Sequence, residues 1–250
     1  MDDKKRIMEL ANRSFQTGMY TFTDFLGLAQ QSELWELEKE ISFAGVKLYG
    51  GYEQADRVIA RFGREEDMGY DLAFPIVCIH ISPLMKKFSD DLSHRDFLGA
   101  LMNLGIERST IGDIKVSEKE AYIFCLDNMA QYISDNLFKV KHTSVKCTVL
   151  ADAESISSHF IDEQPKEKIV VVSSLRADGM ISKVYNLSRN ESLELFQSQK
   201  VFINGKLSEN NSQQVKNGDV INARGYGKFK IGSEPKETRK GKISISAYIW

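Results

Sequence analysis

Several features that would place this chain outside the ordinary class of globular proteins are missing from its sequence. No apolar run approaches the roughly 18 residues that a membrane-spanning helix needs, so we expect no membrane span. The N-terminus begins Met-Asp-Asp-Lys-Lys-Arg and has neither the apolar core nor the cleavage site of a secretory signal peptide. With 250 residues, of which 42% are hydrophobic and 27% charged, the chain is long enough for two or three domains.

Cysteine is scarce, and its placement argues against two of its uses. The three cysteines, Cys78, Cys125 and Cys147, are odd in number, and their spacing fits no metal site. Each lies in an apolar stretch that is typical of a strand, so we expect buried free thiols in a reducing cytosol. The sequence therefore indicates a cytoplasmic protein without a zinc site, and we expect no cofactor.

Three short segments resemble catalytic motifs but lack the residues that the chemistry needs. His94-Arg95-Asp96 is similar to a kinase catalytic loop, but the asparagine expected five residues later is Leu101. Gly225-Tyr226-Gly227-Lys228 lacks the spacing of a phosphate-binding loop. Met180-Ile181-Ser182-Lys183 resembles the Lys-Met-Ser-Lys-Ser loop of synthetases, but no nucleotide-binding βαβ unit precedes it. We interpret Ser93 with Asp96 as a helix cap instead.

Charge is divided unequally along the chain although the net charge is only −2. Residues 1–175 carry 20 lysines and arginines against 28 acidic residues, whereas residues 176–250 carry 13 against 7. A basic segment of this kind is typical of a module that binds a polyanion such as RNA. The alternative is that the basic C-terminal third only aids solubility.

Four short patterns follow one another within this basic segment. They are Arg176-Ala177-Asp178, Ser188-Arg189, Val201-Phe202-Ile203-Asn204-Gly205 and Gly218-Asp219-Val220-Ile221. Their order resembles the S4 domain, a small RNA-binding module with an αL motif. The chain departs from the S4 pattern at Ser192, where alanine is usual, and at Gln199, where glycine is usual before the strand.

Local sequence signals agree with this resemblance. Ser188 and Glu191 have the spacing of a capping box at the start of a helix, and Asn204-Gly205 is a strong turn signal. An arginine beside the free amides of a helix start attracts phosphate, although Arg189 could also be a simple surface residue. The RNA contacts that we predict in this domain are Arg176, Asp178, Lys183, Ser188, Arg189, Asn204, Lys206, Arg224, Tyr226 and Lys228.

The middle of the chain alternates between strand and helix periodicities. The expected elements are strands at 76–81, 111–116, 121–126 and 145–150 and helices at 93–104 and 129–138. This βαββαβ order predicts a ferredoxin-like, RRM-like fold, in which aromatic residues on the central strands can stack on RNA bases. Tyr122 and Phe124 are two residues apart and share one face, although both could simply pack under the helices.

Two residues at the start of the first of these helices are further candidates for RNA contact. We expect His94 and Arg95 to lie at its exposed positive end, where phosphate binds well. The alternative for Arg95 is an ion pair with a nearby carboxylate such as Asp113.

The remainder of the sequence completes an α+β protein with three domains. Residues 1–72 are predicted to be mainly helical, with helices at 4–16 and 24–41, a strand at 46–49 and a further helix through 55–62. Gly50-Gly51 indicates a tight turn or close approach. Residues 151–174 are the expected linker, with a strand at 169–172. The predicted domains are an N-terminal mostly helical one at 1–72, a ferredoxin-like RNA-binding one at 73–162 and an S4 domain at 175–250.

Nearly the whole chain resembles the YlmH family of bacterial S4-domain proteins. The match is carried by the stretches 50–57, 94–102, 111–114 and 224–229. The resemblance implies a cytoplasmic protein, linked to cell-division genes, that associates with the large ribosomal subunit. It implies contacts with 23S rRNA and peptidyl-tRNA during the rescue of stalled ribosomes, in ribosome quality control. It also implies a non-enzymatic RNA-binding protein, and we expect a monomer off the ribosome.

Two other functions compete with this prediction. S4 modules are often fused to pseudouridine synthases or RNA methyltransferases, so an RNA-modifying enzyme is the main alternative. The synthase would need an Arg-Leu-Asp block and the methyltransferase a glycine-rich turn after its first strand, and residues 1–170 contain neither. The third alternative is an interaction protein linked to cell division.

Overall fold

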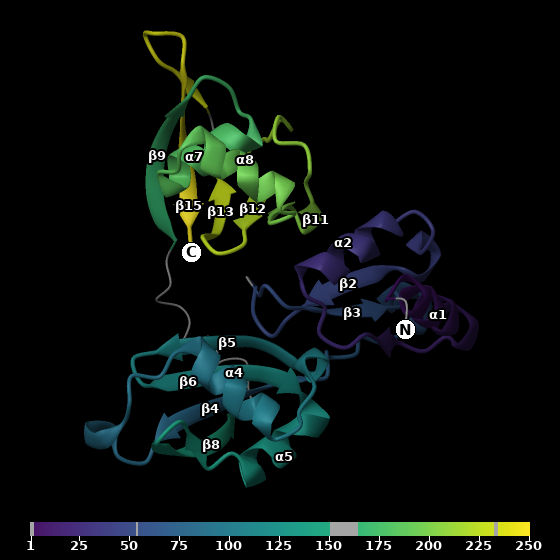
Figure 1. Cartoon of the computed structure of the whole chain (residues 1–250). Helices are drawn as coiled ribbons and strands as arrows, with labels where there is room; N and C mark the ends of the chain where they lie inside the picture. Colours follow the sequence, from purple (N-terminus) through teal and green to yellow (C-terminus); the bar gives the residue numbers. More distant parts are fainter. Residues whose placement is uncertain (1–2, 54, 151–164, 233–234) are drawn as a thin grey trace. The chain divides into compact units, whose positions relative to one another are not determined.

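The protein is an α+β chain that divides into two compact units. The structure is a computed structural model, and it describes residues 3–53, 55–150, 165–232 and 235–250. The first unit holds the described residues up to 150 apart from 31–35, and the second holds 31–35 and the described residues from 165 onward (Figure 1). Gln54, most of the expected linker and the predicted end of the middle domain at residue 162 lie outside the described residues. Within those residues, no helix is long and apolar enough to cross a membrane.

The N-terminal part of the first unit contains a small antiparallel sheet, with strand order β1-β3-β2. Its elements are α1 (Asp3–Thr17), β1 (Thr21–Phe22), the short η1 (Ser42–Ala44), β2 (Val46–Tyr49), β3 (Ile59–Phe62) and α3 (Glu65–Met68). The helix α2 (Leu28–Glu36) follows β1 in the chain, and its residues 31–35 are the ones that belong to the second unit. The helix predicted at 4–16 and the strand predicted at 46–49 are confirmed.

The helix that we predicted through residues 55–62 is wrong. Its apolar residues have helical spacing, but Ile59–Phe62 forms the central strand of the small sheet, and all four residues are buried. Pairing with β1 on one side and β2 on the other satisfies the backbone polar groups of this segment, which outweighs a local helical pattern. The helix expected over 24–41 is also shorter, because α2 ends at Glu36.

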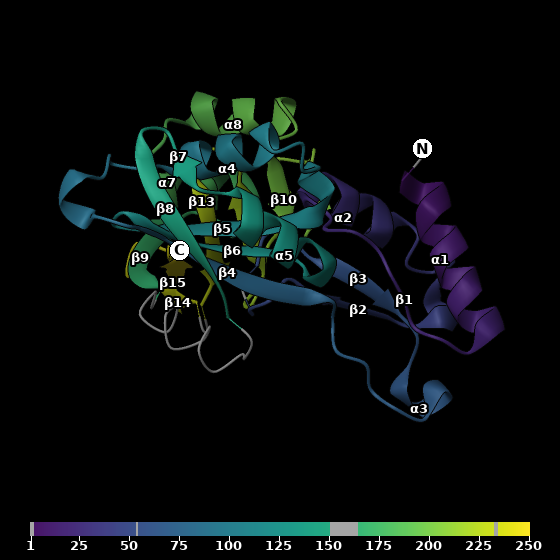
Figure 2. The same cartoon turned by 90° about the horizontal axis from the view of Figure 1, so that it is seen from below.

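A five-stranded antiparallel sheet forms the middle of the first unit. Its elements are β4 (Ile76–Pro83), η2 (Lys86–Phe88), α4 (His94–Asn103), η3 (Arg108–Thr110), β5 (Ile111–Ser117), β6 (Glu120–Leu126), α5 (Asp127–Asn136), β7 (Lys139–Val140) and β8 (Thr143–Leu150). The strand order is β5-β6-β4-β8-β7. Both helices cover one face of this sheet (Figure 2), and Phe97, Leu101 and Ile133 pack there on Ile79 and Ile123.

The opposite face of this sheet is covered by residues from the N-terminal part. Phe25 and Ile59 pack there against Cys78, Tyr122 and Phe124. Tyr122 and Phe124 are 6% and 0% exposed, so the side chains that could have stacked on RNA bases are closed off. The two aromatics are therefore buried as the alternative interpretation held, but on the face away from the helices.

A close backbone approach makes this cover possible. A Cβ atom at Gly51 would lie 2.3 Å from the Phe124 ring, and one at Gly112 would lie 2.6 Å from the Phe25 ring. Gly51 also has a φ of 99°, which only glycine adopts freely. The close approach that Gly50-Gly51 predicted is confirmed, and it brings the N-terminal part onto the sheet.

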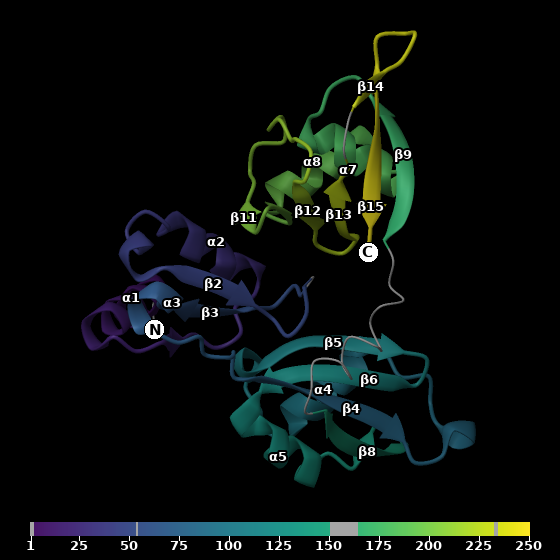
Figure 3. The ribbon, with the colours of Figure 1, turned by 180° about the vertical axis from the view of Figure 1, so that it is seen from behind.

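The second unit joins two helices to an antiparallel sheet. Its elements are β9 (Lys166–Val172), α7 (Ala177–Tyr185), α8 (Arg189–Gln197), β10 (Val201–Ile203), β11 (Lys206–Leu207), β12 (Val220–Ala223), β13 (Gly227–Ile231), β14 (Lys236–Glu237) and β15 (Ile243–Ile249). The strands follow the order β11-β10-β12-β13-β15, and β15 also pairs with β14 and β9 (Figure 3).

The longest pairing of this unit sets where the unit begins. The strand β15 alternates so that Ile243, Ile245 and Ala247 point toward the core, and it pairs antiparallel with β9 over seven residues. The strand predicted at 169–172 is thus confirmed as part of this sheet. Because Val170 and Val172 of β9 belong to its core, the unit extends before residue 175, where we expected the S4 domain to start.

Local caps and turns of the second unit follow the sequence signals. The Ser188 amide donates to the Glu191 carboxylate at 2.8 Å, and the Glu191 amide donates to the Ser188 hydroxyl at 3.2 Å. Asn204 and Gly205 both have positive φ, as the predicted turn requires. Gln199 has a φ of 53°, so it adopts the left-handed conformation that a glycine would adopt more easily.

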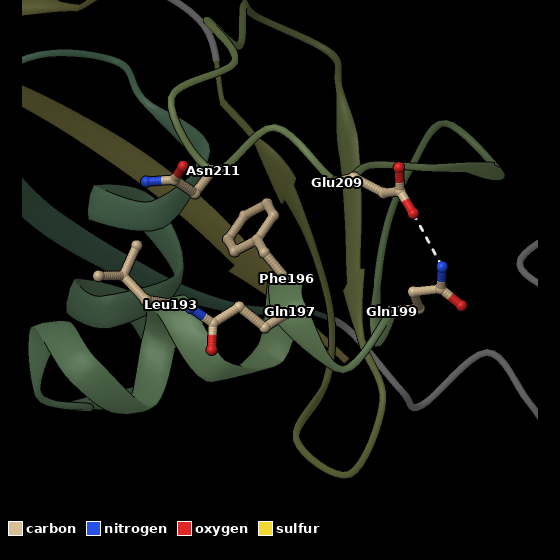
Figure 4. A pocket seen from close by; sticks show the side chains of 6 residues that line it. All are labelled: Leu193, Phe196, Gln197, Gln199, Glu209 and Asn211. Carbon is tan, nitrogen blue, oxygen red and sulfur yellow. Dashed lines mark hydrogen bonds between the residues drawn. The ribbon is translucent and has the colours of Figure 1, made fainter.

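Gln199 and its partner Glu209 both line a hollow beside this turn. It has a volume of about 280 Å³ and lies at the end of α8 (Figure 4). The Gln199 side-chain amide donates to the Glu209 carboxylate at 2.8 Å, which compensates part of the cost of the left-handed backbone. None of the residues that line the hollow is a cation, so it is a poor candidate for binding RNA.

We predict that Gln199→Gly raises the melting temperature. Relief of the left-handed strain contributes about 1–2 kcal/mol, which outweighs about 0.5–1 kcal/mol for the greater chain entropy of glycine together with the small contribution of the exposed bond to Glu209. Gln199→Ala should lower the melting temperature, because it keeps the strain and loses the bond to Glu209. Thermal unfolding followed by circular dichroism measures both. A lower melting temperature for Gln199→Gly would mean that the side-chain bond, and not the backbone, controls this turn.

Candidate nucleic-acid interface

A basic groove in the second unit is the main candidate for RNA binding. It has a volume of about 610 Å³ and lies beside the first turns of α7 and α8. Four cationic side chains line it: Arg176, Lys183, Arg189 and Lys242. Asp178 supplies the single carboxylate of the lining. The groove therefore has an excess of positive charge next to two helix N-termini, which is a favourable place for phosphate.

Asp178 organises the groove and does not face solvent. It is 6% exposed, and its carboxylate accepts from Arg176 Nε at 3.1 Å and Nη2 at 2.8 Å, from the Gly179 amide at 2.8 Å and from Asn211 at 3.2 Å. Burial would raise the pKa of this carboxyl, but these hydrogen bonds outweigh burial and hold the pKa below its usual value. Asp178 is therefore ionised, and it fixes the Arg176 guanidinium in place.

Ser192, where the S4 pattern usually has alanine, also contributes to this arrangement. Ser192 is fully buried, and its hydroxyl donates to the Asp178 carbonyl at 2.9 Å. This bond ties the first turn of α8 to the first turn of α7. An alanine at this position could not make it.

Three of the four cations remain available for a ligand. The side chains of Lys183, Arg189 and Lys242 are exposed and form no hydrogen bond or ion pair with another residue that the structure describes. Lys183 lies on α7, Arg189 is the first residue of α8, and Lys242 comes directly before β15.

Sequence reasoning missed Lys242. It lies 53 residues after Arg189, and no motif includes it. The pairing of Ile243 with Val172 brings it to the groove, so only the register of β15 on β9 reveals its place.

The other predicted residues of this unit fall outside the groove. Arg224 and Tyr226 lie in the turn between β12 and β13, where the Arg224 guanidinium is 5.0 Å from the Phe202 ring and Tyr226 is 45% exposed. Lys228 follows on β13, and Lys206 is exposed on β11. Whether these residues bind RNA stays a prediction.

Asn204 and Ser188 have structural tasks in this unit. The Asn204 side chain donates to Asp219 at 2.9 Å and accepts from the Val220 amide at 2.9 Å, so it stabilises the turn that it occupies. Ser188 caps α8. RNA contacts through these two side chains, like those through Asp178, stay predictions.

His94 and Arg95 lie at the start of α4, as the sequence predicts. The proposed ion pair between Arg95 and Asp113 does not form. The Asp113 carboxylate instead accepts from the Tyr52 hydroxyl at 2.6 Å and from the amides of Asp56 and Arg57 at 2.7 and 3.1 Å.

His94 is held neutral near pH 7. Loss of water around the ring lowers the pKa of His94, and the nearby Arg108 guanidinium lowers it further, while Asp113 acts in the opposite direction. The ring can therefore donate a hydrogen bond to RNA but contributes little positive charge.

Parts of the chain are similar to known proteins. Residues 71–154 match a family model described as a putative RNA-binding domain in YlmH. The chain is 28% identical over 224 residues to the ribosome-associated protein quality control protein P2 of Bacillus subtilis, covering 90% of this chain and 85% of that protein. A solved structure of the cell division protein ylmH from Streptococcus pneumoniae is 24% identical, with a TM-score of 0.49, over 61% of this chain and 91% of that one.

We predict that Arg176→Ala lowers the melting temperature by several degrees and that Arg189→Ala does not. Removal of the Arg176 guanidinium leaves the buried Asp178 carboxylate without its main partner, whereas Arg189 has no partner among the described residues. Differential scanning calorimetry of both variants provides the measurement. Equal melting temperatures for the two would mean that Arg176 is not a structural residue.

We also predict that Arg108→Gln raises the pKa of His94 toward its usual value, because it removes the positive charge beside the ring. Arg95→Gln is the matched control and should leave this pKa unchanged. An NMR titration of the His94 ring measures the effect. An unchanged pKa in Arg108→Gln would leave burial as the whole cause of the shift.

Proposed function

Because the chain belongs to the YlmH family, we propose that it binds RNA on the ribosome through contacts with 23S rRNA and peptidyl-tRNA of the large subunit. Its role would be ribosome quality control, in the rescue of stalled ribosomes. The relative from Bacillus subtilis is named for ribosome-associated protein quality control. The ribosomal partner would place the protein in the cytoplasm, and off the ribosome we propose a monomer.

The basic groove of the second unit is the observation that carries this proposal. Lys183, Arg189 and Lys242 have no carboxylate partner within the described residues, and the carboxylate of Asp178 is already engaged by Arg176. These three cations line one groove beside two helix starts, so a single polyanion can satisfy them together. RNA phosphates have this chemistry, and arginine binds them through two parallel hydrogen bonds.

The arrangement of the elements supports the finer fold assignment that we propose. The order β4-α4-β5-β6-α5-β8, with the sheet order β5-β6-β4-β8, is that of a ferredoxin-like domain with β7 added at the edge. The two short helices α7 and α8 followed by the hairpin strands β10 to β13 have the element order expected of an S4 domain.

We further propose that the chain acts without catalysis. Burial raises the pKa of Cys78 and Cys125 to about 12 and that of Cys147 to about 11, so these thiols stay protonated and are poor nucleophiles at neutral pH. The single carboxylate of the groove is committed to Arg176, Gly179 and Asn211. Incubation with ribosomal RNA followed by nucleoside analysis tests this proposal, and pseudouridine or methylated base formed by the pure protein would contradict it.

We predict that the full chain sediments with the large ribosomal subunit and that Arg189→Ala weakens this association about ten- to a hundredfold, which corresponds to about 1–3 kcal/mol for lost charge-assisted bonds. A variant that makes one phosphate contact fewer releases fewer counterions when it binds. The magnitude of the slope of log affinity against log salt should therefore fall by about 0.7–0.9.

The matched control for this experiment is Arg13→Ala, which removes an exposed arginine from α1 in the other unit. It should leave both the affinity and the salt slope unchanged. Binding that does not depend on salt, or equal losses in the two variants, would contradict a phosphate site at the groove.

A further inference from the structure

A second groove lies on the helix side of the sheet in the first unit. It has a volume of about 610 Å³ and is bounded by α4 on one side and by the end of α5 and the start of β7 on the other. Its lining includes Arg95, Gly99, Asn103, Phe138, Lys139 and Lys141. The covered face of the same sheet, where RRM-type domains bind RNA, is not available to a ligand, so this groove is a separate surface.

Phe138 gives the groove an exposed aromatic ring on a fixed backbone. The residue is 66% exposed and follows directly after α5 and its C-cap, Leu137. Its carbonyl accepts from the Val145 amide at 2.9 Å, which holds the backbone against β8. An exposed aromatic ring on a backbone held in this way can stack on a nucleobase.

The charge of the groove is positive. Arg95 and Lys139 form no hydrogen bond or ion pair through their side chains with another described residue. Asp96 is the single carboxylate of the lining, and it is compensated, because it pairs with Lys141 at 2.9 Å and accepts from the Ser93 amide at 2.8 Å. These bonds lower the pKa of Asp96 to about 2, with those from Ser93 contributing most. Asp96 is therefore ionised, but the Lys141 ammonium offsets its charge, so Asp96 repels a phosphate less than its place in the first turn suggests.

The floor of the groove is open to a flat ligand. A Cβ atom added at Gly99 would have no neighbour within 4 Å, and Ala100 beside it carries only a methyl group. Asn103 lies one turn further along α4 with an exposed amide, which can donate to or accept from the edge of a base.

We propose that this groove binds one nucleotide of single-stranded RNA, with its base stacked on Phe138 and its phosphate held by Arg95 and Lys139. Asn103 would contact the edge of the base. Unpaired RNA is the form that offers a free base face, whereas a duplex offers only phosphates and sugars to such a ring. This inference rests on the proposed RNA-binding function and adds a site that is separate from the basic groove of the second unit.

The first experiment measures the affinity of the full chain for a fluorescent twelve-nucleotide oligouridylate. Loss of the ring in Phe138→Ala should weaken binding about five- to a hundredfold, the range for loss of one stacked base. Phe138→Trp should bind at least as tightly as the parent, because its ring stacks equally well. Arg95→Gln should weaken binding and lower the salt slope by about 0.7, as expected for one phosphate contact with a single strand.

The matched control is Phe88→Ala. Phe88 is 73% exposed on η2 in the same domain but does not line the groove, so its loss should leave the affinity unchanged. Each variant is also checked by thermal unfolding, since a surface ring contributes little to stability and none of these variants should unfold.

The second experiment maps the contact directly. An oligomer that carries 4-thiouridine is crosslinked to the full chain, and mass spectrometry should find the label within residues 137–141 for the parent and not for Phe138→Ala. Equal affinity of Phe138→Ala and the parent, or crosslinks only in the second unit, would overturn the proposal. So would a defect of Phe138→Ala in ribosome association alone with oligouridylate binding intact, because the groove would then bind a protein.

These outcomes separate the groove from the proposed function. If Arg189→Ala loses association with the large subunit while Phe138→Ala behaves as the parent, the groove is wrong and the ribosomal function stands. If the parent chain binds neither oligouridylate nor the large subunit, the proposed function fails together with the groove.

Discussion

The contact that residues 50–53 and 55–57 make with one face of the five-stranded sheet is the constraint on which the rest of the first unit depends. Gly51 lets the backbone approach Phe124 directly, and the Tyr52 ring stacks on Phe124 with ring centroids 5.1 Å apart. Asp113 then anchors the loop through the Tyr52 hydroxyl and two backbone amides. Arg57 adds bonds to the carbonyls of Phe25, Arg108 and Ile111, which fasten the N-terminal part to the sheet. Burial and Arg108 lower the pKa of Arg57 to about 10, so it still carries its charge at neutral pH.

This contact decides which surfaces of the middle domain can take a ligand. An RRM-type domain binds bases on the open face of its sheet, and here that face is part of a hydrophobic core with Phe25 and Ile59. The helix side remains, where α4, the end of α5 and β7 leave a groove lined by the exposed Phe138 ring and the cations Arg95 and Lys139. A domain with the strand order of a nucleic-acid-binding fold therefore offers a different face from the one that its topology alone suggests.

The second unit holds several cations close together at a low energetic cost. The Asp178 carboxylate compensates the positive charge of Arg176 and accepts a hydrogen bond from Asn211. The Ser192 hydroxyl links α8 to the first turn of α7. The other cations, Lys183, Arg189 and Lys242, remain exposed, where water screens their mutual repulsion. Phosphate contacts of this kind give affinity without selecting a base, whereas a stacked ring requires an unpaired base. The two grooves thus have complementary chemistry.

Much of this protein was determined by local sequence. The capping boxes at Ser93 and Ser188, the turn at Asn204-Gly205, the βαββαβ order and the basic C-terminal third all depend on neighbouring residues or on composition, and all could be predicted. The strand at Ile59–Phe62 could not, because its apolar spacing also fits a helix and only pairing on both sides decides between them. The burial of Phe124 and the place of Lys242 were likewise decided by tertiary structure, since each depends on a segment far away in the chain: Gly51 against the sheet in one case, and the register of β15 on β9 in the other.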